Sequence, residues 1–259
     1  MPIPDFFALA KEVGVNAVEL RDGLPPGWAF PESSNVLNHD PQSIARLAND
    51  SAIEILTINA LQRFDQWNGE RAEQARTLIG FAAAAGIRAI VLCPSVAPVG
   101  SRALATGLPA ALDGLQPLLE DAGVRGLIEP LGFPRSSLRT QGVVDAELAR
   151  RGNSDCFGIV HDGFHHAIAR DRHYSPHIAL VHLSGVPDLG LALEDLGDEH
   201  RVLVGPDDIL DNMGQIRRLL GETSAPWSFE PFAREVGASP TLAADLSSSM
   251  NYIRERAQA

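Results

Sequence analysis

The chain has 259 residues, of which 45% are hydrophobic and 21% are charged, and its formal net charge is −12. This length and hydrophobic content favour one domain with a sizeable core, spanning residues 1–259. The acidic balance argues against nucleic acid as a partner, because binding to phosphates requires clustered lysine and arginine.

No apolar run reaches the roughly 20 residues that a membrane span requires, and no basic segment followed by an apolar one opens the chain. We therefore expect a cytoplasmic protein without membrane contact. Cys93 and Cys156 both stand in apolar, strand-like segments. Buried thiols in a reducing compartment are expected, although two cysteines would also permit one disulfide.

Short apolar segments alternate with longer amphipathic segments along the chain. The apolar segments predict seven strands, at residues 16–21, 53–60, 89–95, 124–130, 156–162, 178–185 and 227–232. The amphipathic segments predict helices at residues 3–14, 41–51, 70–86, 103–122, 139–151, 207–220 and 240–257. Asp40 is expected to cap the helix at 41–51, and Gly86 to end the helix at 70–86. Strands and helices that alternate in this way are typical of βα units with a parallel sheet.

Seven strands are one fewer than a (β/α)₈ barrel contains. The chain begins almost directly with the helix at 3–14, so we expect the first strand to be missing or truncated. An open doubly wound sheet needs no eighth strand, but it usually binds ligands at one switch point. Because polar side chains follow four different strands, we predict an α/β fold of the parallel TIM-barrel type. A missing strand would leave an unpaired sheet edge, which predicts a homo-oligomer formed near the N-terminus.

Four acidic or imidazole side chains follow predicted strands in the second half of the chain. They are found in the segments GLIEP, IVHD, LVHLSG and WSFEP, and they are Glu129, Asp162, His182 and Glu230. In a barrel of parallel strands, the carboxyl ends of the strands converge at one mouth. Three carboxylates and one imidazole would suit Mn²⁺, Mg²⁺, Co²⁺ or Zn²⁺. The sequence therefore predicts a metal-dependent enzyme.

Each of these residues also has a structural interpretation. Either glutamate could be solvated at the start of a loop, or paired with Arg21 or Arg88. Capping a helix could be the sole role of Asp162, and His182 could be a core histidine that hydrogen-bonds to the backbone. Asp188 could orient an imidazole or cap a turn. The pairing of two Glu-Pro sequences with apolar strands favours the site, because a buried carboxylate is costly unless it is paired or metal-bound.

The segment HDGFHH places several polar groups just past a strand. Because side chains alternate along a strand, His161 and Asp162 should face opposite ways, and we expect Asp162 to point into the barrel. His165 is expected to contact the substrate or the metal ligands rather than the metal itself. Direct ligation by His165 remains the alternative.

Substrate contacts are expected in the loops. Phe64 and Trp67 could form an aromatic lid that excludes water, or they could only tie down a surface loop. Arg201 could hold a substrate oxygen, or pair with Asp198 or Glu199. Weaker candidates in the long loops are Trp28, His39 and His200.

The motifs IEPLGF, HDGFHH, VHLSG and SFEPF resemble those of the xylose isomerase-like (β/α)₈ superfamily, from about residue 5 to the C-terminus. That superfamily includes sugar isomerases and epimerases, inosose isomerases and dehydratases, and apurinic endonucleases. The resemblance implies that Glu129, Asp162, His182 and Glu230 bind one divalent metal ion. Together with HRVLVGPDDILDN, the motifs are most similar to the inosose isomerase-like branch.

Two departures from the superfamily narrow the function. Ketose 3-epimerases carry an arginine six residues after the strand-end histidine, where this chain has Asp188. The three-metal endonucleases need further ligands on earlier strands, and Asn59, Pro94 and Ser95 do not supply them. Both the epimerase and the endonuclease interpretations are thereby weakened.

The predicted activity is therefore a metal-dependent isomerase that shifts a carbonyl between adjacent carbons of an inosose or ketose through a cis-enediolate. Glu129 and Glu230 would serve as base and acid in either order, and His165 would bind an oxygen or relay a proton. The alternatives are a metal-dependent dehydratase of the inosose type and a non-catalytic sugar-binding barrel. In each case the partner is a small polyol ketone or sugar.

Overall fold

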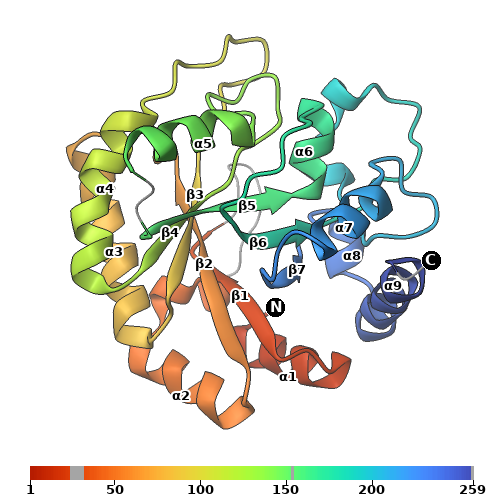
Figure 1. Ribbon diagram of the computed structural model, residues 1–259. Coiled ribbons are helices and arrows are strands. Elements are labelled where there is room, and N and C mark those ends of the chain that lie inside the picture. The colour runs from red at the N-terminus through yellow and green to blue at the C-terminus, as the bar shows by residue number, and fades with distance from the viewer. Residues whose placement is uncertain (24–31, 153–154, 258–259) are drawn as a thin grey trace. The chain divides into compact units, whose positions relative to one another are not determined.

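The computed structural model describes residues 1–23, 32–152 and 155–257. The chain forms two compact units, whose elements are labelled in Figure 1. The first unit comprises Met1–Ser95, Ala105–Ile128 and Glu147–Gly158. The second comprises Val96–Leu104, Glu129–Ala146 and Ile159–Ala259. Each unit has its own strands and helices.

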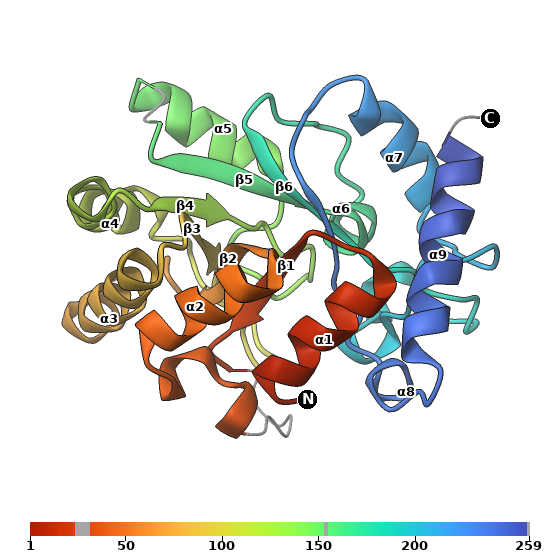
Figure 2. The ribbon, with the colours of Figure 1, turned by 90° about the horizontal axis from the view of Figure 1, so that it is seen from below.

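The first unit is built from parallel strands with helices beside them. Its strands are β1 (Ala17–Arg21), β2 (Glu54–Gln62), β3 (Ala89–Cys93) and β4 (Arg125–Ile128), and successive strands pair in parallel. Its helices are α1 (Ile3–Val13), α2 (Pro41–Ser51), α3 (Gly69–Ala85) and α4 (Leu108–Ala122), with short 3₁₀ turns η1 (Glu32–Ser34) and η2 (Val36–Asn38). In Figure 2, α2, α3 and α4 follow one another along the outside of β2, β3 and β4. The core between these layers includes fully buried Ile58, Leu78, Ile90 and Leu92.

Helix ends in this unit follow the local sequence. The carboxylate of Asp40 accepts a hydrogen bond from the Ser43 backbone N–H at 2.8 Å, as predicted. Gly86 ends α3 in the left-handed region at φ 72°, which also confirms the prediction. The fourth helix begins at Leu108 and not at residue 103. Gly107 precedes the helix and lies close to the Asp65 carbonyl, since an added Cβ would be 2.3 Å from that oxygen.

The second unit continues the same pattern. It contains β5 (Phe157–Asp162) from Ile159 onward, β6 (Ile178–Leu183) and β7 (Trp227–Phe229), and neighbouring strands are again parallel. Its helices are α6 (Gly163–Ala169), α7 (Asn212–Leu220), α8 (Arg234–Gly237), α9 (Leu242–Ala257) and the first part of α5 (Gln141–Arg150), with 3₁₀ turns η3 (Leu193–Asp195) and η4 (Asp198–His200). Helices α7 and α9 lie side by side. One apolar cluster joins β6 to α7 through Val181, Leu183, Ile216 and Leu219.

Two helices of this unit differ from the sequence prediction. Helix α6 was not predicted; it follows β5 without a loop, because the Asp162 carboxylate accepts a hydrogen bond from the His165 N–H at 2.8 Å and caps the helix. Helix α7 begins at Asn212 and not at residue 207. The residues before it are held by Asp208, whose carboxylate accepts hydrogen bonds from the Val186 and Asn212 N–H groups at 3.0 Å each.

The fold is α/β with parallel strands of the TIM-barrel type, and all seven predicted strands are found in the described residues. None of the seven strands in the described residues precedes α1, which fits the prediction of a missing or truncated first strand. The strands at β4 and β7 end one residue before Glu129 and Glu230, so both glutamates stand directly after a strand. Neither cysteine forms a disulfide. Among the helices described, none is long and apolar enough to cross a membrane.

Candidate metal centre

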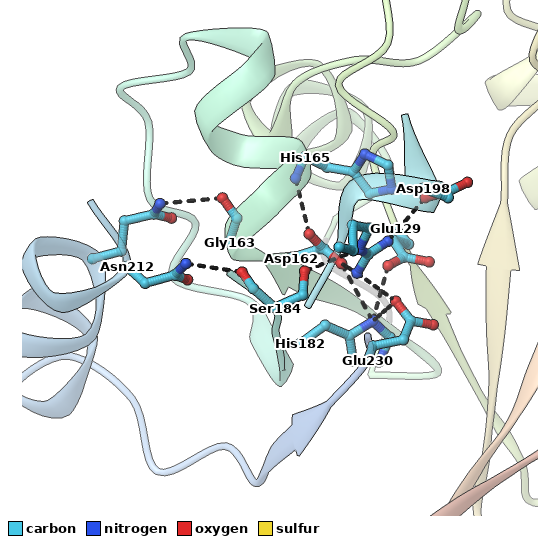
Figure 3. A network of polar contacts seen from close by, with 11 residues as sticks. Glu129, Asp162, Gly163, His165, His182, Ser184, Asp198, Asn212 and Glu230 are labelled. Carbon is cyan, nitrogen blue, oxygen red and sulfur yellow. Dashed lines mark hydrogen bonds and ion pairs between the residues drawn. The ribbon is translucent and has the colours of Figure 1, made fainter. Parts of the chain in front are cut away.

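Four side chains of the second unit meet at one point. Glu129 follows β4, Asp162 ends β5, His182 lies near the end of β6, and Glu230 follows β7. Each offers one ligand atom, and these atoms all lie within 4.8 Å of one another. Figure 3 shows the three carboxylates turned toward the imidazole of His182. The structure thus brings together all four residues that were predicted to bind a metal.

The imidazole of His182 is the centre of the group. Its Nδ1 atom lies 2.9 Å from Oε1 of Glu129, 3.2 Å from Oε2 of Glu230 and 3.9 Å from Oδ2 of Asp162. One Nδ1–H can donate to these oxygens in turn but cannot satisfy all three at once. A cation among the same atoms would contact all four ligands, because ligands on opposite sides of such an ion lie roughly 4–5 Å apart.

Burial makes the charges of this cluster costly. Glu129 is 2% exposed, Asp162 is 3% exposed and His182 is fully buried. Burial raises the pKa of the Glu129 carboxyl, and the negative charge of Glu230 raises it further, while His182 opposes the change. The carboxylates therefore repel one another in a place where water cannot screen them.

A buried arginine lies beside two of the carboxylates. Nη2 of Arg201 lies 2.6 Å from Oδ2 of Asp162 and 2.9 Å from Oε2 of Glu230. Its Nη1 also pairs with the partly exposed Asp198. A divalent cation among Glu129, Asp162 and Glu230 would reduce the repulsion between their carboxylates. The donor set, oxygen-rich with one imidazole, suits Mn²⁺, Mg²⁺, Co²⁺ or Zn²⁺.

The two neighbouring side chains at the end of β5 face opposite ways, as strand alternation predicts. Asp162 faces the carboxylates, whereas His161 lies between two amides. Gln141 donates to Nδ1 of His161 at 2.8 Å, and Nε2 donates to Gln215 at 2.9 Å. Burial and, to a lesser extent, the neighbouring His166 lower the pKa of His161 to about 3. His161 is therefore a neutral part of the packing and not a ligand of this cluster.

His165 is held beside the cluster by aromatic packing. Its ring meets Phe133 and Phe164 edge-on, at centroid distances of 4.9 and 5.1 Å. Burial lowers its pKa to about 3, and the positive charge of Arg201 acts in the same direction. Its Nδ1 is buried and has no hydrogen-bond partner among the residues that the structure describes. Figure 3 shows the ring near Asp198 and outside the group of four ligand atoms.

Glycines in the surrounding motifs permit this packing. In IEPLGF, an added Cβ on Gly132 would lie 2.1 Å from the His165 carbonyl oxygen. The loop after β4 can therefore lie directly against α6 only because residue 132 has no side chain. This contact places Phe133 against the His165 ring, which is a reason for the glycine that the sequence alone did not reveal.

The remaining predicted contacts fall in several places. Phe64 is fully buried in the first unit, and the half-buried Trp67 packs against Gly114 of α4, where an added Cβ would be 2.2 Å from the ring. Asp188 caps a turn by accepting from the Gly190 N–H, which decides between its two interpretations. His200 accepts from the Gly197 N–H. His39 is partly buried and contacts the Ser33 carbonyl, and Trp28 lies outside the described residues.

Comparisons with known proteins identify the family of the chain. The model of a family described as xylose isomerase-like TIM barrel matches residues 7–256. The chain belongs to the xylose isomerase-like TIM barrel family. No curated protein matches the sequence.

Solved structures of this family share the fold. A xylose isomerase domain containing protein from Salmonella typhimurium LT2 is 29% identical, with a TM-score of 0.85 over 100% of this chain and 93% of that chain. A structure of the IolI protein, which holds a zinc atom, is 18% identical, with a TM-score of 0.78 over 99% of this chain and 91% of that one. An L-ribulose 3-epimerase is 17% identical, with a TM-score of 0.70 over 98% and 88% of the two chains.

The sequence did not reveal which residues hold the carboxylates of the cluster in place. Arg201 was predicted to contact substrate or to pair with Asp198 or Glu199. The structure shows the pair with Asp198. It also shows ion pairs from Arg201 to Asp162 and Glu230, which were not predicted. Ser184, which accepts from Nε of Arg201 at 2.9 Å, was not predicted at all. The serine of LVHLSG carried the only signal, because it directly follows a strand end.

Proposed function

We propose that this protein is a divalent-metal-dependent isomerase that shifts a carbonyl between adjacent carbons of an inosose or ketose. The observation that carries the proposal is the meeting of Glu129, Asp162, Glu230 and His182 within 4.8 Å. The three carboxylates come from three different strands and can therefore reach a substrate from different directions.

The metal is proposed to be one Mn²⁺, Mg²⁺, Co²⁺ or Zn²⁺ ion held by the four side chains. When bound, such an ion polarises a carbonyl and acidifies the neighbouring C–H group. The zinc atom in the IolI structure supports a metal in this fold, and the L-ribulose 3-epimerase supports a sugar-type substrate.

Glu129 and Glu230 are proposed to move the proton between the two carbons. A carboxyl whose pKa is raised by burial is a stronger base than an exposed one, and Glu129 is such a group. Glu230 is 12% exposed at its side chain, so it is the more accessible of the pair. One glutamate takes the proton from the first carbon, and the other returns a proton to the second.

His165 is proposed to contact a substrate oxygen. Because its pKa is lowered to about 3, the ring is neutral at physiological pH. A neutral imidazole can donate from one nitrogen and accept at the other, so it can follow a carbonyl that becomes a hydroxyl. Phe133 and Phe164 fix the plane of the ring, which limits it to one orientation.

The aromatic contacts of the first unit remain part of the proposal. Trp67 retains exposed surface, whereas Phe64 is fully buried. We propose that Trp67 stacks on the apolar face of the substrate and that Phe64 supports the loop. Arg201 donates four of its five side-chain N–H groups to protein side chains.

Solvent exchange tests the function directly. The purified protein is incubated in D₂O with a panel of inososes and ketoses, with Mn²⁺ or with EDTA, and the products are followed by mass spectrometry. We expect metal-dependent deuterium uptake and a product of equal mass. Loss of water would indicate the dehydratase, and metal binding without any turnover would indicate a sugar-binding protein.

Two variants assign the chemistry to the site. Glu230→Gln should lose the exchange, and Glu235→Gln, which changes an exposed glutamate of α8, should keep it. If the wild type binds no divalent metal ion, the proposed function is wrong.

A further inference from the structure

Arg201 is an arginine buried in the second unit with only 1% of its surface exposed. It follows η4 and lies between two aromatic rings, with its guanidinium carbon 5.0 Å from the Phe164 centroid and 4.9 Å from the Phe232 centroid. A planar cation between two rings has little freedom to turn. Its hydrogen bonds therefore have fixed directions.

Four of its five N–H groups are used by neighbouring side chains. Nη2 donates to Asp162 at 2.6 Å and to Glu230 at 2.9 Å, Nε donates to Ser184 at 2.9 Å, and Nη1 donates to Asp198 at 3.2 Å. Arg201 therefore directs most of its hydrogen-bonding capacity at the protein itself. It acts on the site through the two carboxylates that it holds.

Asp162 is fixed from both sides. Its Oδ1 accepts from the His165 N–H at the start of α6, and its Oδ2 accepts from Arg201. Loss of the arginine would leave one of these two restraints. The carboxylate could then rotate about its last side-chain bond, and Oδ2 would leave the position that lies 3.9 Å from Nδ1 of His182.

The segment that carries Glu230 is also tied to Arg201. The side-chain bond from Nη2 reaches Oε2, while the backbone carbonyl of Arg201 accepts from the N–H groups of Phe232 and Ala233 at 2.9 and 2.8 Å. The strand β7 has only three residues, so it gives the glutamate little support of its own. Arg201 supplies the missing support at two points.

Arg201 is itself held in place by the motif that precedes α7. Ser184, which accepts from Nε, has its carbonyl bound by the Asn212 side chain at 2.8 Å. Asn212 is in turn bound by Asp208. Figure 3 shows Asn212 next to Ser184 and Gly163, on the side away from the cluster. A chain of hydrogen bonds thus runs from the start of α7 to the ligands.

We propose that Arg201 is a positioning residue that orders Asp162 and Glu230 for the metal ion and so strengthens metal binding. This inference rests on the proposed metal site. A positive charge beside a cation opposes binding by Coulomb repulsion, whereas fixed ligands favour it because less freedom is lost when the ion binds. Arg201 contacts two of the four proposed ligands directly. The proposal is therefore that its ordering of Asp162 and Glu230 strengthens metal binding more than its positive charge weakens it.

The test compares metal affinity in Arg201→Gln with that of the wild type. The Mn²⁺ dissociation constant is measured by competition with a chelator on full-length protein, and the melting temperature is measured in EDTA. We expect about 10-fold to 100-fold weaker binding, the usual effect of removing a group that orients metal ligands. Arg201→Lys should recover only part of the loss, because an ammonium cannot form the planar set of bonds.

Arg151→Gln is the matched control. Arg151 is also largely buried and pairs with Asp113 and Glu147, carboxylates outside the cluster. Its loss should lower the melting temperature without changing Mn²⁺ affinity. Affinity that is unchanged or higher in Arg201→Gln would overturn the inference while leaving the metal site intact. A wild type that binds no Mn²⁺ would instead overturn the proposed function.

Ser184→Ala decides the case if Arg201→Gln does not fold. The change removes only the hydroxyl that orients Nε, so the charge stays and the arginine loses one restraint. We expect Mn²⁺ binding to weaken about threefold, in line with the loss of one modest hydrogen bond. Equal affinity in Ser184→Ala and the wild type would contradict a positioning role.

Discussion

The two sides of β5 carry buried polar groups of opposite kinds. On one side, His161 lies between the amides of Gln141 and Gln215, and each ring nitrogen has one partner. On the other side, Asp162 lies among carboxylates, an imidazole and one guanidinium. The first group is neutral, whereas the second brings three carboxylates together around one imidazole.

The two groups differ in how burial affects them. The neutral imidazole of His161 has one donor and one acceptor as partners, so its burial is satisfied. The carboxylates of the other group repel one another because buried like charges are destabilising, and a bound divalent cation would reduce this repulsion. Under the proposed function, His161 therefore serves stability and Asp162 serves metal binding.

The largest expected effect comes from removing a carboxylate of the cluster. Glu129→Gln should lower turnover by about 10² to 10⁴-fold, the usual contribution of a proton-transferring group. The same change should raise the melting temperature in EDTA, because it removes a buried charge whose ionisation is unfavourable. Turnover rates and thermal melts of the metal-free protein measure the two effects. A lower melting temperature in EDTA would show that the charge stabilises the fold.

A comparable change on the amide side should affect stability alone. Gln215 accepts from His161 and donates to the Gly163 and Leu210 carbonyls, so Gln215→Leu leaves several buried groups without partners. We expect a loss of about 2–4 kcal/mol in the free energy of unfolding, since each such group costs about 1–3 kcal/mol. Urea unfolding measures this loss. Mn²⁺ affinity should stay close to that of the wild type, and a large drop would mean that the two sides of β5 are coupled.

Acid should destabilise the protein through its buried histidines. His161 and His165 have folded-state pKa values lowered to about 3 from an ordinary value of 6.5. As pH falls below 6.5, the unfolded chain binds protons that the folded chain refuses, so stability falls. Between pH 7 and 5 each histidine contributes about 2 kcal/mol to this loss. Urea unfolding in EDTA at both pH values measures it, and a flat profile would contradict neutral buried rings.

The smallest effect is expected at Asp188. This residue is exposed and caps a turn through the Gly190 N–H, so Asp188→Asn should change turnover by less than about twofold. Steady-state kinetics on the substrate found in the exchange experiment measures it. A large loss would show that Asp188 orients His182 after all.

The sequence was a good guide to strands and ligands for a physical reason. Apolar strands that end in a charged residue are conspicuous, because few positions combine burial with charge. Glu129, Asp162, His182 and Glu230 were recognisable by that contrast. Strand alternation also separated Asp162 from His161 correctly.

The supporting residues could not be predicted in this way. Arg201 stands in a loop shortly after Asp198 and Glu199, which looks like a solvated surface in the sequence. Its burial depends on Phe164 and Phe232, which are distant along the chain. The late start of α7 likewise depends on a contact between Asp208 and Val186. Long-range contacts of this kind leave no local pattern.

The proposed function requires that the cluster around Asp162, on one side of β5, binds one divalent ion. The most direct measurement is calorimetric titration of chelator-treated protein with Mn²⁺, compared between the wild type and Asp162→Asn. We expect one Mn²⁺ ion per chain in the wild type and binding at least about 10-fold weaker in Asp162→Asn, because the variant loses a charged ligand. No binding by the wild type, or equal affinity in both proteins, would contradict it.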